Sequence, residues 1–258
     1  MRGWRGGSGF PILLIHGSGP GAGSVGNWRL VLDDLARQYD VLAIDLIGFG
    51  ASDRKTDGPS FDFGLWTRQA AAALEWLVPD GAVGVIGHSI SAAIAFQLAA
   101  DRPRINGVLG TGCMGAAMPV NAHLNHVWRC PKNRSDMATA ARLLINDPAL
   151  ITDAYLDARM EIIGDPAYQA YFDDMFARPF ADYIAQATIA DDVLSKVTAP
   201  TILLHGTQDL AFPIEHCSDV LAPKIPKADL WRLANCSHSI AMERRDAFLA
   251  ACQLLFPQ

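Results

Sequence analysis

Short runs of branched apolar residues that stop at a polar residue or glycine restrict the possible folds of this chain most strongly. Three such runs lie in its first third, over residues 12–15, 41–44 and 83–86, and end against His, Asp or Gly. They lack period-two alternation, as strands of a parallel sheet do when both faces are buried. Helical patterns follow over residues 28–39, 63–77 and 90–100. This alternation predicts βαβ units around a mostly parallel sheet.

In the second half of the chain, a stretch of predicted helices without strands interrupts the alternation of strands and helices, which then resumes. More strands are predicted over residues 105–113, 201–206 and 229–233. Between them, Asp-Pro steps separate amphipathic helices expected over residues 137–145, 148–163, 166–176 and 180–187. We therefore predict a core made of residues 1–113 and 195–258, with a helical lid inserted over residues 114–194.

Composition excludes several classes of partner. The chain has 258 residues, and 21 Lys and Arg against 27 Asp and Glu give a net charge of −6, which disfavours nucleic acid and anionic membranes. No signal peptide or apolar run of membrane-spanning length occurs. Five cysteines without a CxxC pair predict reduced thiols, no metal and no cofactor. We expect a soluble, cytoplasmic protein that acts on a small molecule.

A candidate nucleophile stands where an apolar strand meets an Ala-rich helix. The segment Gly87-His88-Ser89-Ile90-Ser91 resembles the G-x-S-x-G turn that exposes a serine hydroxyl above a sheet, with Ser91 in place of the last glycine. Small residues are needed there because the sharp turn crowds backbone against backbone. Serines before helices also serve as N-caps, so Ser89 alone has a structural interpretation.

Two later residues complete a possible triad in the chain order serine, acid, histidine. Asp209 follows the strand over residues 201–206, and His238 follows the strand over residues 229–233. A serine hydroxyl needs a base, and the base needs an acid that holds its tautomer. Separately, Asp209 could start a turn and His238 could be a polar residue before a helix; together with Ser89 they predict nucleophilic catalysis.

The glycine-rich loop over residues 16–23 directly follows the first apolar run. No Walker lysine or G-x-G-x-x-G spacing accompanies it, so phosphate binding is the weaker interpretation. In an acyl-transfer site, the backbone N–H groups of Ser18 and Ile90 would form an oxyanion hole.

These motifs together resemble the α/β-hydrolase superfamily over nearly the whole chain. Gly17-Ser18-Gly19-Pro20-Gly21-Ala22, followed by Asn27, is similar to the meta-cleavage-product hydrolases, as is the lid from Asp147-Pro148 to Arg159. That resemblance implies hydrolysis of a C–C bond in a ring-fission dienone of the 2-hydroxy-6-oxohexa-2,4-dienoate type, made during degradation of aromatic compounds.

The resemblance also implies roles for individual residues. His238 would assist tautomerisation of the dienol, and Ser89, or water activated beside it, would attack the distal ketone. Substrate contacts are expected from Gly17, Gly19, Asn27, His88, Arg159 and Ser239. Structural alternatives are an N-cap for Asn27 and a solvated helix position for Arg159.

Three positions depart from the usual pattern of that family. His88 and Ser91 stand where Asn and Gly are usual, and Ser239 replaces a tryptophan, which predicts a smaller or differently shaped substrate. Gly-His-Ser-Ile-Ser also resembles bacterial stress-regulator hydrolases and plant butenolide receptors. Ester or lactone hydrolysis, and slow ligand sensing, are therefore the alternative functions.

The short stretch before His16 predicts a truncated N-terminal part of the sheet. Family members usually have two antiparallel strands there, whereas 15 residues precede His16. We expect about six strands, with the family's first strand absent and the second vestigial. The resulting exposed edge could be covered by another copy of the chain. Two further residues, His205 and Cys236, are expected to be structural.

Overall fold

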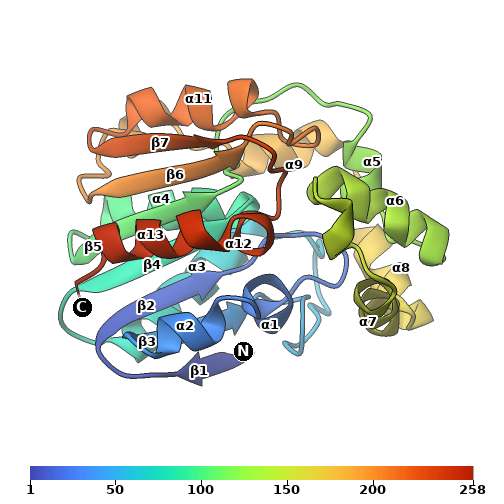
Figure 1. Ribbon diagram of the computed structural model, residues 1–258, viewed down its shortest axis with the longest axis horizontal. Coiled ribbons are helices and arrows are strands. Elements are labelled where there is room, and N and C mark those ends of the chain that lie inside the picture. The colour runs from blue at the N-terminus through green and yellow to red at the C-terminus, as the bar shows by residue number, and fades with distance from the viewer. Residues whose placement is uncertain (258) are drawn as a thin grey trace.

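The computed structural model describes residues 1–257, which form a seven-stranded sheet in the order β1-β3-β2-β4-β5-β6-β7 (Figure 1). The strands are β1 (Arg2–Gly6), β2 (Phe10–Ile15), β3 (Tyr39–Asp45), β4 (Val83–His88), β5 (Ile105–Thr111), β6 (Thr201–Gly206) and β7 (Ala228–Leu233). All pairings are parallel except that of β1 with β3. The carboxyl ends of β2 to β7 therefore share one edge of the sheet, as the alternation of strands and helices predicts.

The sheet has seven strands where about six are expected, and the expectation of a vestigial N-terminal strand is wrong. Residues Arg2 to Gly6 pair along their whole length with β3, from Arg2 opposite Asp45 to Gly6 opposite Val41. Trp4 packs against one hydrophobic core, and Arg5 forms an ion pair with Asp40. Glycines at four of the first nine positions weakened the strand pattern in the sequence, but backbone pairing does not require side chains.

Helices cover both faces of the sheet and explain why its strands read as continuous apolar runs. Leu13 and Ile15 pack into one core with residues of α3 (Phe63–Leu77) and α4 (Ile90–Asp101), while Ile12 and Leu14 pack into the other with residues of α2 (Leu32–Ala36) and α13 (Arg245–Leu255). The covering helices are α1 (Ser24–Trp28), α2 (Leu32–Ala36), α3 (Phe63–Leu77), α4 (Ile90–Asp101), α11 (Ser218–Leu221), α12 (Ile240–Glu243) and α13 (Arg245–Leu255), with 3-10 turns η2 (Ile214–His216) and η3 (Ala222–Lys224).

The helix predicted over residues 28–39 is wrong in its continuity. Its apolar residues Trp28, Val31, Leu32 and Leu35 are all buried in one core. However, α1 ends at Trp28, α2 begins at Leu32, and β3 begins at Tyr39. The helical spacing of apolar residues correctly predicted which side chains are buried, but it did not predict the break between α1 and α2. The helix over Phe63–Leu77 has the predicted bounds, because the Asp62 side chain caps it by accepting from Leu65 N.

The segment between β5 and β6 contains helices and no strand over its described residues 114–194. These are α5 (Leu124–Val127), α6 (Arg134–Leu144), η1 (Pro148–Leu150), α7 (Asp153–Ile163), α8 (Pro166–Met175), α9 (Phe180–Ala187) and α10 (Asp191–Leu194). Helices α5 to α8 lie beyond the carboxyl edge of the sheet (Figure 1). The single helix expected over residues 148–163 is divided, because Thr152 caps α7 by accepting from Tyr155 N. None of the helices in residues 1–257 is long and apolar enough to cross a membrane.

Candidate active site

Ser89 occupies a strained turn between β4 and α4. Its φ of 58° and ψ of −124° are unusual for a residue with a side chain and cost on the order of 1–3 kcal/mol. The turn is held from both sides, because Ser89 N donates to Thr111 O at 2.8 Å and Met114 N donates to Ser89 O at 3.1 Å. A Cβ on Gly87 would lie 2.3 Å from the Ser91 carbonyl oxygen, so only glycine fits there. The Ser89 side chain makes no capping hydrogen bond, which removes the N-cap interpretation.

Ser91, the departure from the usual glycine, has a partner of its own. Its hydroxyl is fully buried and donates to the backbone oxygen of His16, at 2.5 Å. The His16 ring is also buried and accepts from Leu46 N at 3.0 Å. Ser91 therefore ties the start of α4 to the loop that begins at Gly17.

Asp209 and His238 form a buried hydrogen-bonded pair beside this turn. His238 Nδ1 lies 2.6 Å from Asp209 Oδ2, and Phe212 N donates to the other carboxylate oxygen at 2.9 Å. Burial alone would raise the pKa of Asp209, but the charge of His238 and the hydrogen bonds from His205 and His238 outweigh it and hold that pKa well below its usual range. The carboxylate fixes the ring of His238 so that Nε2 is its free nitrogen.

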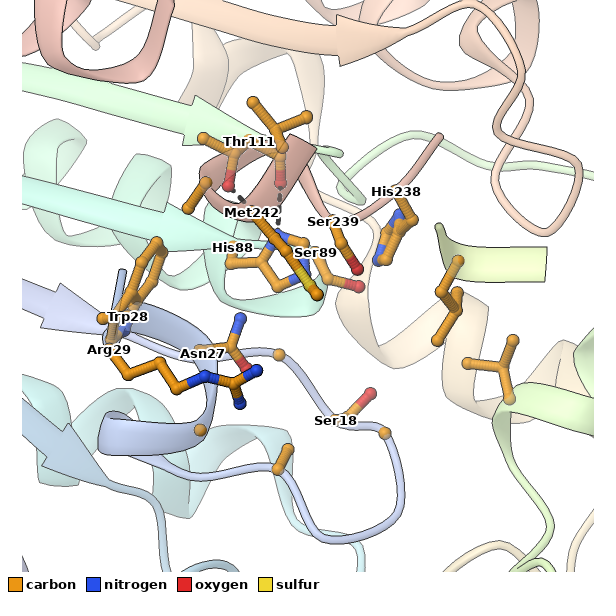
Figure 2. Close-up of a pocket in the computed structure, with 18 of the residues that line it drawn as sticks. Ser18, Asn27, Trp28, Arg29, His88, Ser89, Thr111, His238, Ser239 and Met242 are labelled. Carbon is orange, nitrogen blue, oxygen red and sulfur yellow. Dashed lines mark hydrogen bonds between the residues drawn. The ribbon is translucent and has the colours of Figure 1, made fainter. Parts of the chain in front are cut away.

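Ser89 and His238 line the same cavity of about 100 Å³ (Figure 2). The residues that line it are Gly17, Ser18, Gly19, Ala22, Gly26, Asn27, Trp28, Arg29, His88, Ser89, Thr111, Val127, Leu144, Tyr155, Arg159, His238, Ser239, Ile240, Ala241 and Met242. Every residue expected from the sequence to contact substrate is in this set. Asp209 lies behind His238, and Ile90 is fully buried at the start of α4.

The loop after β2 packs tightly on the serine turn. A Cβ on Gly17 would lie 3.0 Å from the His88 ring and 3.1 Å from Ser89 Cβ, so this position favours glycine. The Ser18 hydroxyl accepts a hydrogen bond from Trp128 Nε1 at 3.0 Å. Trp128 follows α5 in the helical segment, and its contact joins residues 110 positions apart. Nothing in the sequence pattern pointed to it.

Arg159 is neither a solvated residue nor free in the cavity. Its guanidinium donates to the Gly21 oxygen at 3.0 Å and to the Pro20 oxygen, which joins α7 to the glycine-rich loop. Asn27 lies inside α1, which Gly23 precedes, so the N-cap interpretation of Asn27 is wrong.

Comparison with known proteins identifies the family to which this chain belongs. The Alpha/beta hydrolase family model matches residues 12–251. The chain belongs to the α/β-hydrolase family. It is 30% identical to 2-hydroxymuconate semialdehyde hydrolase of Pseudomonas sp. (strain CF600), over 94% of this chain and 85% of that protein. It is 28% identical to 2-hydroxy-6-oxo-2,4-heptadienoate hydrolase of Pseudomonas putida F1, over 94% and 87%.

A solved structure supports the same relationship. The meta-cleavage product hydrolase from Pseudomonas fluorescens IP01 superposes with a TM-score of 0.89 at 27% identity, covering 97% of this chain and 92% of that one. The chain is therefore an enzyme, a hydrolase of a family whose members use a Ser-His-Asp triad.

In this hydrolase the helical segment also contacts the loop that carries His238. Ser239 N donates to Leu144 O at 2.9 Å, and the Ser237 hydroxyl donates to Leu143 O at 2.7 Å. The carboxylate of Glu243 accepts from Ser237 N on one side and from Asn146 N on the other, at 2.8 and 2.6 Å. The end of α6 therefore helps to hold the loop of the catalytic-histidine candidate.

Two residues of the hydrolase that could be mistaken for catalytic groups are structural, as expected. His205 is fully buried, with Nδ1 2.7 Å from the Ser218 hydroxyl and Nε2 2.9 Å from the Phe212 oxygen. Cys236 is fully buried, and burial raises the pKa of its thiol far above the usual range. Arg29 lines the cavity but was missed, because its position after Trp28 in a helical pattern carried no sign of a ligand.

Proposed function

We propose that this hydrolase cleaves a C–C bond in a ring-fission dienone of the 2-hydroxy-6-oxohexa-2,4-dienoate type. Ser89 is the nucleophile, His238 the general base and acid, and Asp209 the group that orients His238. The backbone N–H groups of Ser18 and Ile90 stabilise the oxyanion. The observation that carries the proposal is the charge of the cavity beside Ser89, taken with the substrates named for the similar hydrolases.

The cavity suits an anionic substrate. Its described lining residues include Arg29 and Arg159 and no Asp or Glu, although acidic residues outnumber basic ones in the chain. Arg29 is exposed, and its guanidinium lies 5.7 Å from the centre of the Tyr155 ring. Figure 2 shows its side chain beside Asn27. Arg159 holds the loop at Pro20 and Gly21 and adds positive charge behind it. A carboxylate at this end would place the dienone chain toward Ser89.

The aromatic residues beside His238 favour a small group on the distal ketone. Aromatic residues fill the far side of His238: Phe212 stacks on its ring at 4.8 Å, and Trp128 lies 5.9 Å from Phe212. We infer that hydrogen or methyl on the ketone fits better than an aryl group, as in the substrates named for the two Pseudomonas relatives.

The chemistry proceeds in two stages. His238 first assists conversion of the dienol to its keto tautomer, which gives the breaking bond an electron sink. Ser89 Oγ then attacks C6 as His238 takes its proton, and the C5–C6 electron pair moves through the C3=C4 bond onto the C2 oxygen, which is protonated. Water, deprotonated by His238, hydrolyses the acyl-enzyme. The products are a carboxylic acid and 2-hydroxypenta-2,4-dienoate.

Residues 114–194 act in this proposal as a lid on a core made of residues 1–113 and 195–258. The hydrogen bonds of Trp128 to Ser18 and of Arg159 to Gly21, which join this segment to the glycine-rich loop, support the proposal. We also propose a cytoplasmic location, which the five buried, unpaired cysteines support. Association of two copies through the β1 edge stays a prediction.

Absorbance of the dienolate provides the test. We expect purified enzyme to consume 2-hydroxy-6-oxo-2,4-heptadienoate with a kcat/KM well above that for p-nitrophenyl acetate, and Ser89→Ala to abolish turnover of both. If the dienone is hydrolysed no faster than the ester, C–C hydrolysis is refuted and ester hydrolysis becomes the better assignment. Uniformly slow turnover of both would favour the ligand-sensing alternative.

The arginines can be tested separately. Arg29→Gln should raise KM for the anionic dienone about tenfold, because a charge-assisted hydrogen bond is lost, and leave p-nitrophenyl acetate unchanged. Arg68→Gln, on the exposed side of α3, removes the same charge far from the cavity and serves as the control. If both substitutions change KM for the dienone equally, Arg29 acts only through the net charge of the protein and does not bind the substrate carboxylate.

A further inference from the structure

The ring of His16 is held in one tautomer behind the glycine-rich loop. Its Nε2 accepts a hydrogen bond from Leu46 N at 3.0 Å, so this nitrogen carries no proton. In a neutral imidazole the proton is then on Nδ1, which lies 2.6 Å from the Gly17 carbonyl oxygen and donates to it. Burial lowers the pKa of the fully buried ring, although the Gly17 carbonyl and the charge of Asp45 oppose this shift, so His16 carries no charge at neutral pH.

This hydrogen bond fixes the orientation of the peptide between Gly17 and Ser18. The peptide is planar and trans, so its carbonyl oxygen and its N–H point in opposite directions. The carbonyl oxygen points to the ring of His16, which is not among the residues that line the cavity. The N–H of Ser18 therefore points away from His16, and Ser18 lines the cavity together with Ser89 (Figure 2).

The backbone N–H of Ser18 has no acceptor within the described part of the chain. Ser18 is 3% exposed, and among the hydrogen bonds of residues 1–257 none uses this N–H. The same holds for the N–H of Ile90, the fully buried residue that follows Ser89. Nearly all buried backbone N–H groups in folded proteins are paired, so two unpaired donors beside the nucleophile are best explained by a negatively charged oxygen that both bind during the reaction.

We propose that His16 is a positioning residue for the oxyanion hole: its Nδ1–H holds the Gly17 carbonyl away from the cavity and so presents the N–H of Ser18 to the oxyanion that forms at Ser89. The inference rests on the proposed function only through Ser89 and the oxyanion hole, which C–C and ester hydrolysis share. Without this donor the peptide can rotate and place a carbonyl oxygen, which repels negative charge, where the N–H is needed. Glycine at position 17 offers no side chain to resist that rotation.

Two substitutions of His16 separate its two hydrogen bonds. The amide of asparagine reaches the position of Nδ1 and can donate to the Gly17 oxygen, whereas that of glutamine reaches the position of Nε2 and can accept from Leu46 N. With p-nitrophenyl acetate we expect His16→Gln to lower the acylation rate at least about tenfold, with KM within about threefold of wild type. His16→Asn should keep the acylation rate within about threefold of wild type, although it loses the Leu46 bond and unfolds at lower urea concentration.

A purely structural role of His16 predicts a different result. Activity would then follow stability, and the less stable of the two variants would also be the slower one. The proposal is overturned if His16→Asn acylates more slowly than His16→Gln, or if His16→Gln acylates within about threefold of wild type.

NMR of the wild-type enzyme keeps the proposal testable if neither variant folds. In nitrogen-labelled histidine, His16 should show a protonated Nδ1 and an unprotonated Nε2, and the opposite tautomer would overturn the proposal. Butylboronic acid supplies the oxyanion: Ser89 Oγ adds to boron while its proton passes to His238, which gives a tetrahedral boronate anion that resembles the transition state.

The amide of Ser18 reports where the boronate oxygen binds. In nitrogen-labelled serine, we expect a downfield shift of the Ser18 amide proton and little change for Ser239, whose N–H donates to Leu144 O. An unchanged Ser18 amide in the adduct would overturn the proposal. If the adduct and the ester activity form as expected but the dienone is not hydrolysed, C–C hydrolysis has failed while the role of His16 stands. If the boronate does not add to Ser89, both have failed.

Discussion

Replacing Ser91 with alanine should weaken this enzyme, even though glycine is the usual residue at that position. The Ser91 hydroxyl donates to the His16 oxygen at 2.5 Å, and both residues are fully buried. Ser91→Ala leaves that carbonyl without this donor in a site that water cannot reach, which costs about 2 kcal/mol. Ser91→Gly loses the same bond and adds the backbone entropy of glycine in a helix, for a total of about 3 kcal/mol.

Urea unfolding followed by circular dichroism measures this loss, and turnover of the dienone reports its effect on the site. Because His16 directly precedes Gly17 and Ser18, we expect kcat to fall about tenfold, less than the loss of a whole oxyanion donor would cause. Ser135→Ala is the matched control: Ser135 is likewise the second residue of its helix, α6, but is exposed. The reasoning is refuted if Ser91→Ala unfolds within about 0.5 kcal/mol of wild type, or if Ser91→Gly is more stable.

Three further predictions concern the lid, acid stability and the thiols. Trp128→Phe keeps the stacking on its neighbours but loses the bond to Ser18, so stability should fall by about 1 kcal/mol in urea unfolding and kcat should fall with it. Burial alone would raise the pKa of Asp45, but hydrogen bonds from two backbone N–H groups outweigh it and hold that pKa below the usual value. The free energy of unfolding should therefore decline as pH falls below about 4. In Asp45→Asn, thermal melts across this pH range should show a smaller decline. Burial raises the pKa of Cys113 to about 12 and of Cys130 to about 11, so an aromatic disulfide reagent should react with the thiols only on unfolding; rapid native labelling would contradict this.

Much of the fold was predictable because its signals are local. A strand buried on both faces must be apolar throughout. The start of the helix Phe63–Leu77 is marked in the sequence by Asp62, whose side chain caps it. Ser89, Asp209 and His238 were also predictable, since each lies in the loop or turn that follows a strand and the carboxyl ends of these strands share one edge. Glycine-rich residues 2–6 were harder, because their pairing with β3 depends on backbone groups alone.

The sequence by itself determined the alternation of strands and helices along the chain and the edge of the sheet at which the candidate catalytic residues gather, because periodicity and strand ends act over a few residues. Only the tertiary structure decided which atoms meet there: Trp128 on Ser18, Arg159 on Gly21, and Thr111 on the ring of His88. These partners lie 110, 138 and 23 residues apart, and their geometry depends on how helices and loops pack. The sequence shows that a histidine, His88, precedes Ser89. That Nδ1 of its ring carries a proton follows only from the Thr111 carbonyl, which the neighbouring strand places against that nitrogen.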